Sequence, residues 1–358
     1  MKIAVIPGDG IGKEVMQEAM KILNCLMQHD ATLQVEATVF PWSSDYYMEH
    51  GRMMPEDALE TLKSYDAILF GAVGDERVPE HETIWGLIMP IRKQFQQYVN
   101  FRPIKSLPNI ISPLVNGNNV DFVIFRENIE GEYSNSGGQL YPNQPQELAI
   151  QNTVMTRIGI EKITKAACDY ARKYGKKKIT SATKSNAIVH TMRFWDEHVK
   201  QTVAQTDLQL EFYYIDALAA YFVERPQDFE VIVASNLFGD ILSDLGSAIV
   251  GGLGLSPSAN LNPENEFPSM FEPVHGSAPD IAGRGIANPI AQIWSLALLL
   301  GHLGRTDAEQ LVITAIEEVL RKGQVKTADI GGTSTTAEMG DGICDVISAV
   351  RIAQAGGV

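Results

Sequence analysis

The chain has 358 residues, of which 45% are hydrophobic and 20% are charged, and its formal net charge is −15. This composition is that of an ordinary globular protein, and the length suggests two domains rather than one core. The acidic balance argues against a nucleic-acid-binding protein, which needs a surplus of Lys and Arg to neutralise phosphates. An anionic substrate would instead require positive charge that is concentrated locally, which makes individual arginines informative.

Cysteine usage and the apolar segments indicate a cytoplasmic protein without a membrane anchor. Cys25, Cys168 and Cys344 lie in helix-like apolar contexts without metal-ligand spacing, as expected of reduced thiols. The first residues, MKIAVIPGDG, predict a strand and a turn rather than a secretory leader. The longest apolar stretch, Ile293–Leu303, is too short to span a membrane and predicts a core helix.

Short apolar segments of β type alternate along the chain with segments of helical period, which is the pattern of an α/β fold. The expected strands are Lys2–Ile6, Thr32–Phe40, Asp66–Phe70, Val120–Phe125, Lys178–Ser181, Leu208–Ile215 and Phe229–Ala234. The expected helices are Lys13–Gln28, Pro55–Ser64, Arg157–Tyr174, Ala217–Glu224, Pro289–Leu303 and Asp307–Lys322. The polar segment Asn128–Glu147 is too long for a tight connection and predicts either an arm or an excursion that contacts a partner.

The turn after the first expected strand, PGDGIG from Pro7 to Gly12, has the composition of a phosphate-binding loop but not its spacing. Its glycines follow G-x-G-x-G, and Asp9 would bring negative charge beside a pyrophosphate. A tight strand-to-helix turn that needs glycine backbone is the simpler interpretation.

Three arginines, a tyrosine and a lysine are candidates for binding and proton transfer. Arg92, Arg102 and Arg126 suit a carboxylate pocket because a guanidinium group binds a carboxylate through two hydrogen bonds, although each could be a surface residue. Arg126 follows a buried strand, so its side chain should emerge where α/β sites lie. Tyr133 lies in the polar segment. Lys184 follows a short strand and suits a general base, with a solvated loop lysine as the alternative.

Two aspartates follow the last expected strand, in the segment NLFGDILSDLG from Asn236 to Gly246. Asp240 and Asp244 are four residues apart in a helical pattern, so both carboxylates project from one face. Such a pair suits Mg²⁺ or Mn²⁺, although a solvated helix face would look the same. Asp216 is either the N-cap residue of the helix Ala217–Glu224 or a third carboxylate for the same cation.

The segment HGSAPDIAGRGIANP, His275–Pro289, is dense in Gly, Pro, Ser and Asn and predicts a long shaped loop. The loop is either a connector or a nucleotide pocket. In the second case His275, Asn288 and backbone amides would form the pocket, and Asp280 would accept hydrogen bonds from ribose hydroxyls.

Taken together, seven separated motifs resemble the metal-dependent β-decarboxylating dehydrogenases, which act on isocitrate, 3-isopropylmalate, tartrate or D-malate. The motifs are GDGIG, NFRP, FRENIEGEYS, TSATKSN, YYIDALAAYFV, SNLFGDILSDL and EPVHGSAPDIAGRGIANP, and the resemblance extends over the whole chain. It implies an α/β fold of two domains, distinct from the Rossmann fold. The large domain would comprise residues 1–98 and 253–358 with the cofactor loop, and the small domain residues 99–252 with the dimer interface and an arm near 128–150.

The resemblance also implies the roles of particular residues. The arginines that bind substrate carboxylates match Arg92, Arg102 and Arg126, the acid/base pair matches Tyr133 and Lys184, and the metal aspartates match Asp216, Asp240 and Asp244. The adenine-contacting positions match His275 and Asn288, the cofactor loop includes Gly276, Ser277 and Ala278, and the ribose-binding acid of NAD-dependent members matches Asp280. The enzyme would be a homodimer in which the partner supplies Lys184 and Asp216.

Substrate choice in this family depends on the segment before Arg92, here TIWGLIMPI. Trp85 stands where isopropylmalate enzymes carry an acidic residue, and its indole should favour a substrate with little on C3, although it could equally be a core residue. The tartrate and D-malate branch therefore fits best, with NAD as cofactor. The choice between Mg²⁺ and Mn²⁺ and a role for K⁺ as activator stay open.

Three alternatives remain at this point. The nearest is a dehydrogenase for 3-isopropylmalate. A metal-dependent phosphotransferase that used Gly8–Gly12 as a phosphate loop would lack the expected Gly-Lys-Ser/Thr ending. A catalytically silent assembly protein would dimerise without turnover.

Overall fold

The computed structural model describes residues 1–115 and 117–356, and the chain divides into two compact units. The first unit comprises Met1–Gln96, Lys105–Asn119 and Ser247–Val358, and the second comprises Gln97–Ile104 and Val120–Gly246. The segment Lys105–Asn119, which the sequence analysis placed in the small domain, thus lies in the first unit. Its contacts there explain this, since the Lys105 ammonium lies 2.7 Å from a Glu317 carboxylate oxygen.

The first unit is built on five strands in the spatial order β2, β1, β3, β12, β11. Their bounds are β1 Lys2–Gly8, β2 Glu36–Val39, β3 Ala67–Ala72, β11 Pro257–Leu261 and β12 Ser269–Pro273. The first four in spatial order run parallel, and β11 pairs antiparallel with β12. The central strands β1 and β3 are buried on both faces, which explains their nearly continuous apolar sequences.

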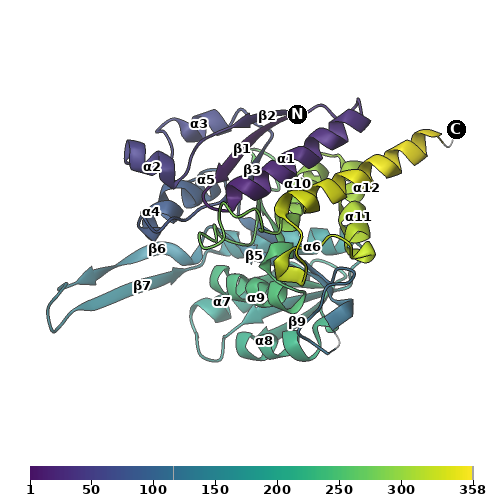
Figure 1. Cartoon of the computed structure of the whole chain (residues 1–358). Coiled ribbons are helices and arrows are strands. Elements are labelled where there is room, and N and C mark those ends of the chain that lie inside the picture. Colours follow the sequence, from purple (N-terminus) through teal and green to yellow (C-terminus); the bar gives the residue numbers. More distant parts are fainter. Residues whose placement is uncertain (116, 357–358) are drawn as a thin grey trace. The chain divides into compact units, whose positions relative to one another are not determined.

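Four long helices gather on one side of this unit (Figure 1). They are α1 Gly12–His29, α10 Ile290–His302, α11 Thr306–Lys322 and α12 Thr336–Gly356. Helix α10 is the expected core helix, and nearly all of its side chains are buried. No helix within the described ranges is long and apolar enough to cross a bilayer.

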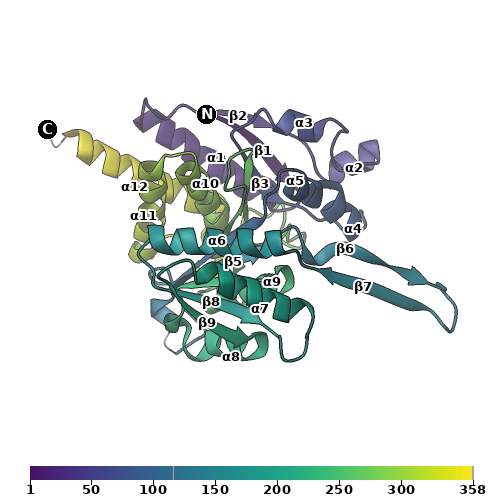
Figure 2. The ribbon, with the colours of Figure 1, turned by 180° about the vertical axis from the view of Figure 1, so that it is seen from behind.

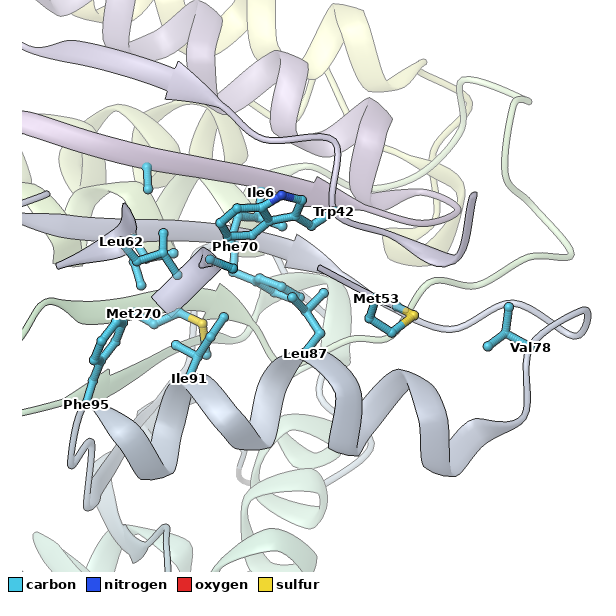
Figure 3. Close-up of a cluster of buried hydrophobic side chains, with 13 residues drawn as sticks. Ile6, Trp42, Met53, Leu62, Phe70, Val78, Leu87, Ile91, Phe95 and Met270 are labelled. Atoms are coloured by element: carbon cyan, nitrogen blue, oxygen red, sulfur yellow. The ribbon is translucent and has the colours of Figure 1, made fainter. Parts of the chain in front are cut away.

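An apolar cluster of the first unit packs strands β1, β3 and β12 against the segment Glu80–Gln94 (Figure 3). Phe70, Leu87, Ile91 and Phe95 are among its fully buried members. The segment comprises α4 Glu80–Thr83, a π-helical turn Ile84–Ile88 and α5 Met89–Gln94. The remaining short elements of the unit are α2 Ser44–His50, α3 Ala58–Leu62 and the 3₁₀ turns Gly117–Asn119, Leu253–Leu255 and Ala328–Ile330.

The second unit contains five strands in the order β4, β5, β10, β8, β9. They are β4 Val99–Lys105, β5 Asp121–Glu127, β8 Lys178–Thr183, β9 Gln209–Tyr214 and β10 Val231–Ala234. Strand β10 runs parallel to both β5 and β8, and β8 runs parallel to β9. The helices are α6 Arg157–Lys173, α7 Thr191–Val203, α8 Ile215–Glu224 and α9 Asn236–Ile249, with a 3₁₀ turn at Pro226–Asp228, and α6 and α7 pack on β8 (Figure 2).

The polar segment after β5 forms an antiparallel hairpin of β6 Gly131–Leu140 and β7 Leu148–Val154. Most of its side chains are exposed, including the apolar side chains of Leu140, Leu148 and Ile150. A two-stranded ribbon with exposed apolar residues is marginal by itself, so the hairpin has the character of an arm.

Several elements differ from the sequence-based expectation. The predicted strand Thr32–Phe40 is reduced to β2, and the predicted helix Pro55–Ser64 is reduced to the five residues of α3. Helices α7 and α12 and strands β4, β11 and β12 were not predicted. Strand β12 contains Glu272 within an apolar sequence, and α12 has a weak apolar period, so local pattern gave little signal.

Candidate active site

The turn between β1 and α1 is a tight turn that needs glycine backbone, as predicted. Asp9 is 3% exposed, and its carboxylate accepts hydrogen bonds from the Ser44 amide at 2.9 Å and hydroxyl at 2.6 Å and from the Gly74 amide at 3.0 Å. Gly10 has a φ of +52° and packs so closely on the Ser277 carbonyl that a Cβ atom would clash. The carboxylate of Asp9 is thus engaged within the first unit, and Gly10 is needed for close backbone packing.

A polar cluster of the second unit lies where β5 and β10 end. The two strands are parallel and Ala234 pairs with Arg126, so the residues that follow both strands meet at one edge. Arg126 donates from Nε and Nη2 to the Asn236 side-chain oxygen at 3.0 and 2.8 Å, and from Nη1 to Asp240 Oδ1. Gly239 permits this approach, because a Cβ atom there would lie 2.6 Å from the Arg126 Cβ.

Arg102, at the middle of β4, contacts both aspartates of α9. Its Nη1 atom lies 3.6 Å from Asp240 Oδ1 and 3.5 Å from Asp244 Oδ1, and it also donates to the Ser243 hydroxyl. Burial raises the pKa of Asp244; the Arg102 guanidinium opposes this rise, and the Asp240 carboxylate adds to it. Two guanidinium groups therefore converge on two carboxylates that share one helix face.

Tyr133 completes this cluster from strand β6. Its hydroxyl donates to Asp240 Oδ2 at 3.0 Å, and its ring centroid lies 5.6 Å from the Arg126 guanidinium carbon. Burial raises the pKa of Tyr133, and the Asp240 carboxylate raises it further. The phenol thus retains its proton beside the aspartate.

Lys184 and Asp216 form a separate pair in the same unit. Lys184 follows β8, and its ammonium lies 2.6 Å from Asp216 Oδ1. The N-cap interpretation of Asp216 is wrong, since α8 begins at Ile215 and Asp216 lies inside its first turn. Within the described residues no three acidic, His or Cys side chains form a metal-binding group, so one chain does not bring Asp216 together with Asp240 and Asp244.

In the first unit, Arg92 and Trp85 occupy the segment Glu80–Gln94. Arg92 lies on α5 and donates from Nη2 to Glu272 Oε1 at 2.7 Å, and the Asn260 amide donates to the same oxygen at 2.6 Å. Trp85 lies in the π-helical turn, a feature common at functional sites. It is half-buried, lies outside the apolar cluster of Phe70 and Leu87, and has the Lys93 ammonium 4.8 Å above its ring.

The loop from His275 to Asn288 is anchored on α1. The Glu14 carboxylate accepts hydrogen bonds from the amides of Gly283 and Gly285, and the Ile11 amide donates to the Ser277 carbonyl at 2.8 Å. Gly276 and Asp280 are exposed, Ser277 is buried, and Ala278 adopts a left-handed φ of +40°. The loop is therefore held to α1 and to the turn before it by backbone hydrogen bonds, and it exposes Gly276 and the Asp280 carboxylate.

His275 and Asn288, at the two ends of this loop, differ in whether their polar atoms already have hydrogen-bond partners. His275 Nδ1 contacts the Gly276 carbonyl at 2.9 Å, whereas its buried Nε2 has no hydrogen-bond partner within the described chain. Burial lowers the pKa of His275, which favours the neutral ring. Asn288 is occupied, since its amide donates to Asp329 at 3.0 Å and its oxygen accepts from the Ile290 amide at 3.0 Å.

Sequence reasoning missed the partners that hold these side chains. Asn236 binds Arg126, Glu272 binds Arg92, and Asp329 binds Asn288. The one local signal was Glu272, an acidic residue within an otherwise apolar segment, because a buried carboxylate needs a cation or donors.

Comparison with known proteins identifies relatives that cover nearly the whole chain. The family model described as isocitrate/isopropylmalate dehydrogenase matches residues 2–343. The chain is 51% identical over 345 residues to a probable tartrate dehydrogenase/decarboxylase of Bacillus subtilis (strain 168), covering 96% of this chain and 97% of that protein. It is 47% identical over 358 residues to a D-malate dehydrogenase [decarboxylating] of Escherichia coli (strain K12), covering 97% and 98%.

Comparison with solved structures leads to the same family. The crystal structure of isocitrate dehydrogenase from Methylococcus capsulatus superimposes with a TM-score of 0.87 at 32% identity, covering 97% of this chain and 99% of that one. The predicted family and two-domain α/β fold are thereby confirmed. The chain belongs to the isocitrate/isopropylmalate dehydrogenase family.

Proposed function

We propose that this chain catalyses the NAD⁺- and divalent-metal-dependent oxidation and decarboxylation of a small 2-hydroxy diacid, D-malate to pyruvate and CO₂, and that it also oxidises tartrate. The observation that carries the proposal is the convergence of Arg102, Arg126 and Tyr133 on Asp240 and Asp244. Relatives with 47% and 51% identity bear the names D-malate dehydrogenase [decarboxylating] and probable tartrate dehydrogenase/decarboxylase.

The donor set fits a hard cation. Asp240 and Asp244 offer only carboxylate oxygens, which suit Mg²⁺ or Mn²⁺, and we assign Asp216 of the partner subunit as the third ligand. When bound, the cation would lower the pKa of the substrate hydroxyl and offset the negative charge that develops as CO₂ leaves. Arg92, Arg102 and Arg126 would bind the two substrate carboxylates and hold the diacid in one orientation.

Two side chains are assigned to proton transfer. Lys184 of the partner subunit would accept the proton of the substrate hydroxyl, and NAD⁺, when bound, would supply the hydride acceptor for C2. The Tyr133 hydroxyl, which donates a hydrogen bond to Asp240, would donate a proton to the carbon that loses CO₂. The base and the acid are thus assigned to side chains on different parts of the chain. Within one chain the pairs Lys184–Asp216 and Tyr133–Asp240 are likewise separate.

The loop Gly276–Asn288 and His275 are assigned to NAD⁺. His275 is assigned to a polar edge of adenine, since its Nε2 atom has no hydrogen-bond partner in the described chain. The exposed carboxylate of Asp280 suits a ribose diol and would repel a 2′-phosphate, which favours NAD⁺ over NADP⁺. Asn288 would act mainly by shaping the loop, because its side chain binds Asp329 and the start of α10.

A homodimer is part of the proposal. Asp216 is 67% exposed beside Lys184, and Ile241, between the two aspartates of α9, is 53% exposed. The arm carries further exposed apolar side chains. Large exposed apolar residues next to the proposed metal ligands, such as Ile241, suit burial in a subunit interface. The three free thiols suit the cytoplasm.

A substrate panel tests the proposed reaction and the role of Trp85. We expect NADH formation with D-malate and tartrates in the presence of Mn²⁺, and little with 3-isopropylmalate. Trp85→Leu should raise kcat/KM for 3-isopropylmalate relative to D-malate by about tenfold, because the smaller side chain leaves room for a branched group. Ile84→Ala, which trims an exposed neighbour, serves as the control. Preference of the parent enzyme for 3-isopropylmalate would contradict the proposal.

Mixing two inactive variants tests whether subunits share a site. Asp216→Asn and Asp240→Asn should each be inactive as purified dimers. In a co-refolded equal mixture, a heterodimer has one site with both substituted aspartates and one with neither, so about a quarter of parental activity should return. Light scattering gives the assembly state of each sample. No recovery from a dimeric mixture would show that each site is built from a single chain.

A further inference from the structure

The start of strand β6, which carries Tyr133, is not held by the hairpin ladder. Gly131 pairs with Val154 and the next pair is Ser136 with Asn152, so five steps along β6 oppose two along β7. Asn135 adopts a left-handed φ of +58° within this bulge. Within the described hairpin, ladder pairing therefore does not fix residues 132–135, and other contacts must place Tyr133.

Glu132 supplies such contacts, because its carboxylate binds the beginning of α9. Its Oε2 atom accepts a hydrogen bond from the Leu237 amide at 3.1 Å, and its Oε1 atom accepts one from the Ser235 hydroxyl at 3.3 Å. The first amides of a helix have no partner within the helix and carry partial positive charge. A carboxylate delivered from another element is therefore well suited to this position.

The neighbouring residue on β6 reaches the same helix one turn later. Tyr133 donates its hydroxyl proton to Asp240, while Asn236 at the start of α9 donates to the Glu130 carbonyl at 3.1 Å. The bulge is thus joined to α9 on both sides of Glu132. Since Asp240 and Asp244 lie on α9, the contact that holds β6 to this helix also sets the distance from the Tyr133 hydroxyl to both carboxylates.

We propose that Glu132 is a positioning residue, which binds the first turn of α9 and thereby fixes the Tyr133 hydroxyl relative to Asp240 and Asp244. The inference rests on the proposed function, because it assigns to Glu132 the placement of the proton donor. Glu132 does not itself transfer the proton. Loss of its carboxylate removes two of the hydrogen bonds that hold the bulge against the start of α9, and small displacements of a catalytic group have large effects on rate.

Two substitutions separate placement from general stability. Glu132→Ala should lower kcat for D-malate on the order of ten- to a hundredfold, with KM for D-malate within about twofold of the parent value, since Tyr133 is needed for proton transfer and not for substrate binding. Glu132→Gln should recover part of the loss, because its amide oxygen can still accept from Leu237. Glu197→Gln, the same change on an exposed residue of α7, is the matched control. An unchanged kcat in Glu132→Ala would overturn the proposal.

A second readout does not depend on turnover. 3-Fluorotyrosine incorporated at position 133 should give one ¹⁹F resonance in the parent dimer, and Glu132→Ala should shift or split it, whereas Glu197→Gln should not. An identical resonance in Glu132→Ala would refute the positioning role. If the parent enzyme oxidised none of the diacids, the proposed function would fail while this measurement still decided the placement of Tyr133.

Ser235→Ala provides a milder variant in case Glu132→Ala does not fold. It removes only the hydroxyl that donates to Glu132 Oε1, so the Leu237 contact is retained. We expect a severalfold loss of kcat and a smaller change of the ¹⁹F resonance. Parental values for both would count against the proposal.

Discussion

Asp240→Asn should lower metal-dependent turnover of D-malate by about a thousandfold or more, because the substitution removes one negative charge from a dication site and from the partner of Tyr133. Folding should survive. Arg126 keeps its two hydrogen bonds to Asn236, and the new amide oxygen can still accept from Arg126 Nη1. Steady-state NADH formation measures the loss, and Mn²⁺ binding followed by electron paramagnetic resonance should weaken in parallel.

The control for this variant is Asp169→Asn. Asp169 is an exposed aspartate of α6 that pairs with Lys165 at 2.6 Å, so the substitution makes the same change of charge away from the cluster. It should retain parental turnover and Mn²⁺ affinity. Full activity of Asp240→Asn, with a parental melting temperature, would disprove the metal assignment and with it the proposed chemistry.

Lys184→Ala should lower kcat by about a hundred- to ten-thousandfold, the range expected when a general base is removed. KM for D-malate should change little, because three arginines are assigned to the carboxylates. Added primary amines such as methylamine should restore part of the rate in proportion to their concentration, since a small amine can occupy the space of the lysine and accept the proton.

Lys165→Ala changes an exposed lysine of α6 and is the matched control. Its kcat should equal the parental value and should not rise when amines are added. A structural role for Lys184, limited to its 2.6 Å pair with Asp216, predicts loss of stability without rescue. Thermal unfolding of both variants distinguishes that outcome. Absence of rescue together with near-parental kcat would rule out the base assignment.

The strand-to-helix transition at β10 and α9 is the part of the site that local sequence specified best. Four residues of the predicted strand Phe229–Ala234 form the fully buried strand β10, Val231–Ala234, and Asp240 and Asp244 lie together on the following helix. Strand period and helix period are local properties, so they can be read from a short segment without knowing what packs against it. The seven motifs then identified the family, which the comparisons confirmed.

The partners of the key side chains could not be predicted from local sequence. Arg126 is bound by Asn236, 110 residues away, and Arg92 by Glu272, 180 residues away. The bulge that turns Glu132 and Tyr133 toward α9 has no sequence period, since it exists only because five steps of β6 face two of β7.

By itself, then, the sequence determined the class of fold, the family and the residues able to carry charge and protons, because each of these is expressed in local composition and period. Only the tertiary structure decided which charges neutralise one another, that Asp9 and Asn288 are engaged within the protein, and that Asp216 lies with Lys184 rather than with Asp240 and Asp244. Such pairings depend on how distant segments pack, and a buried polar group is stable only with the partner that packing brings to it.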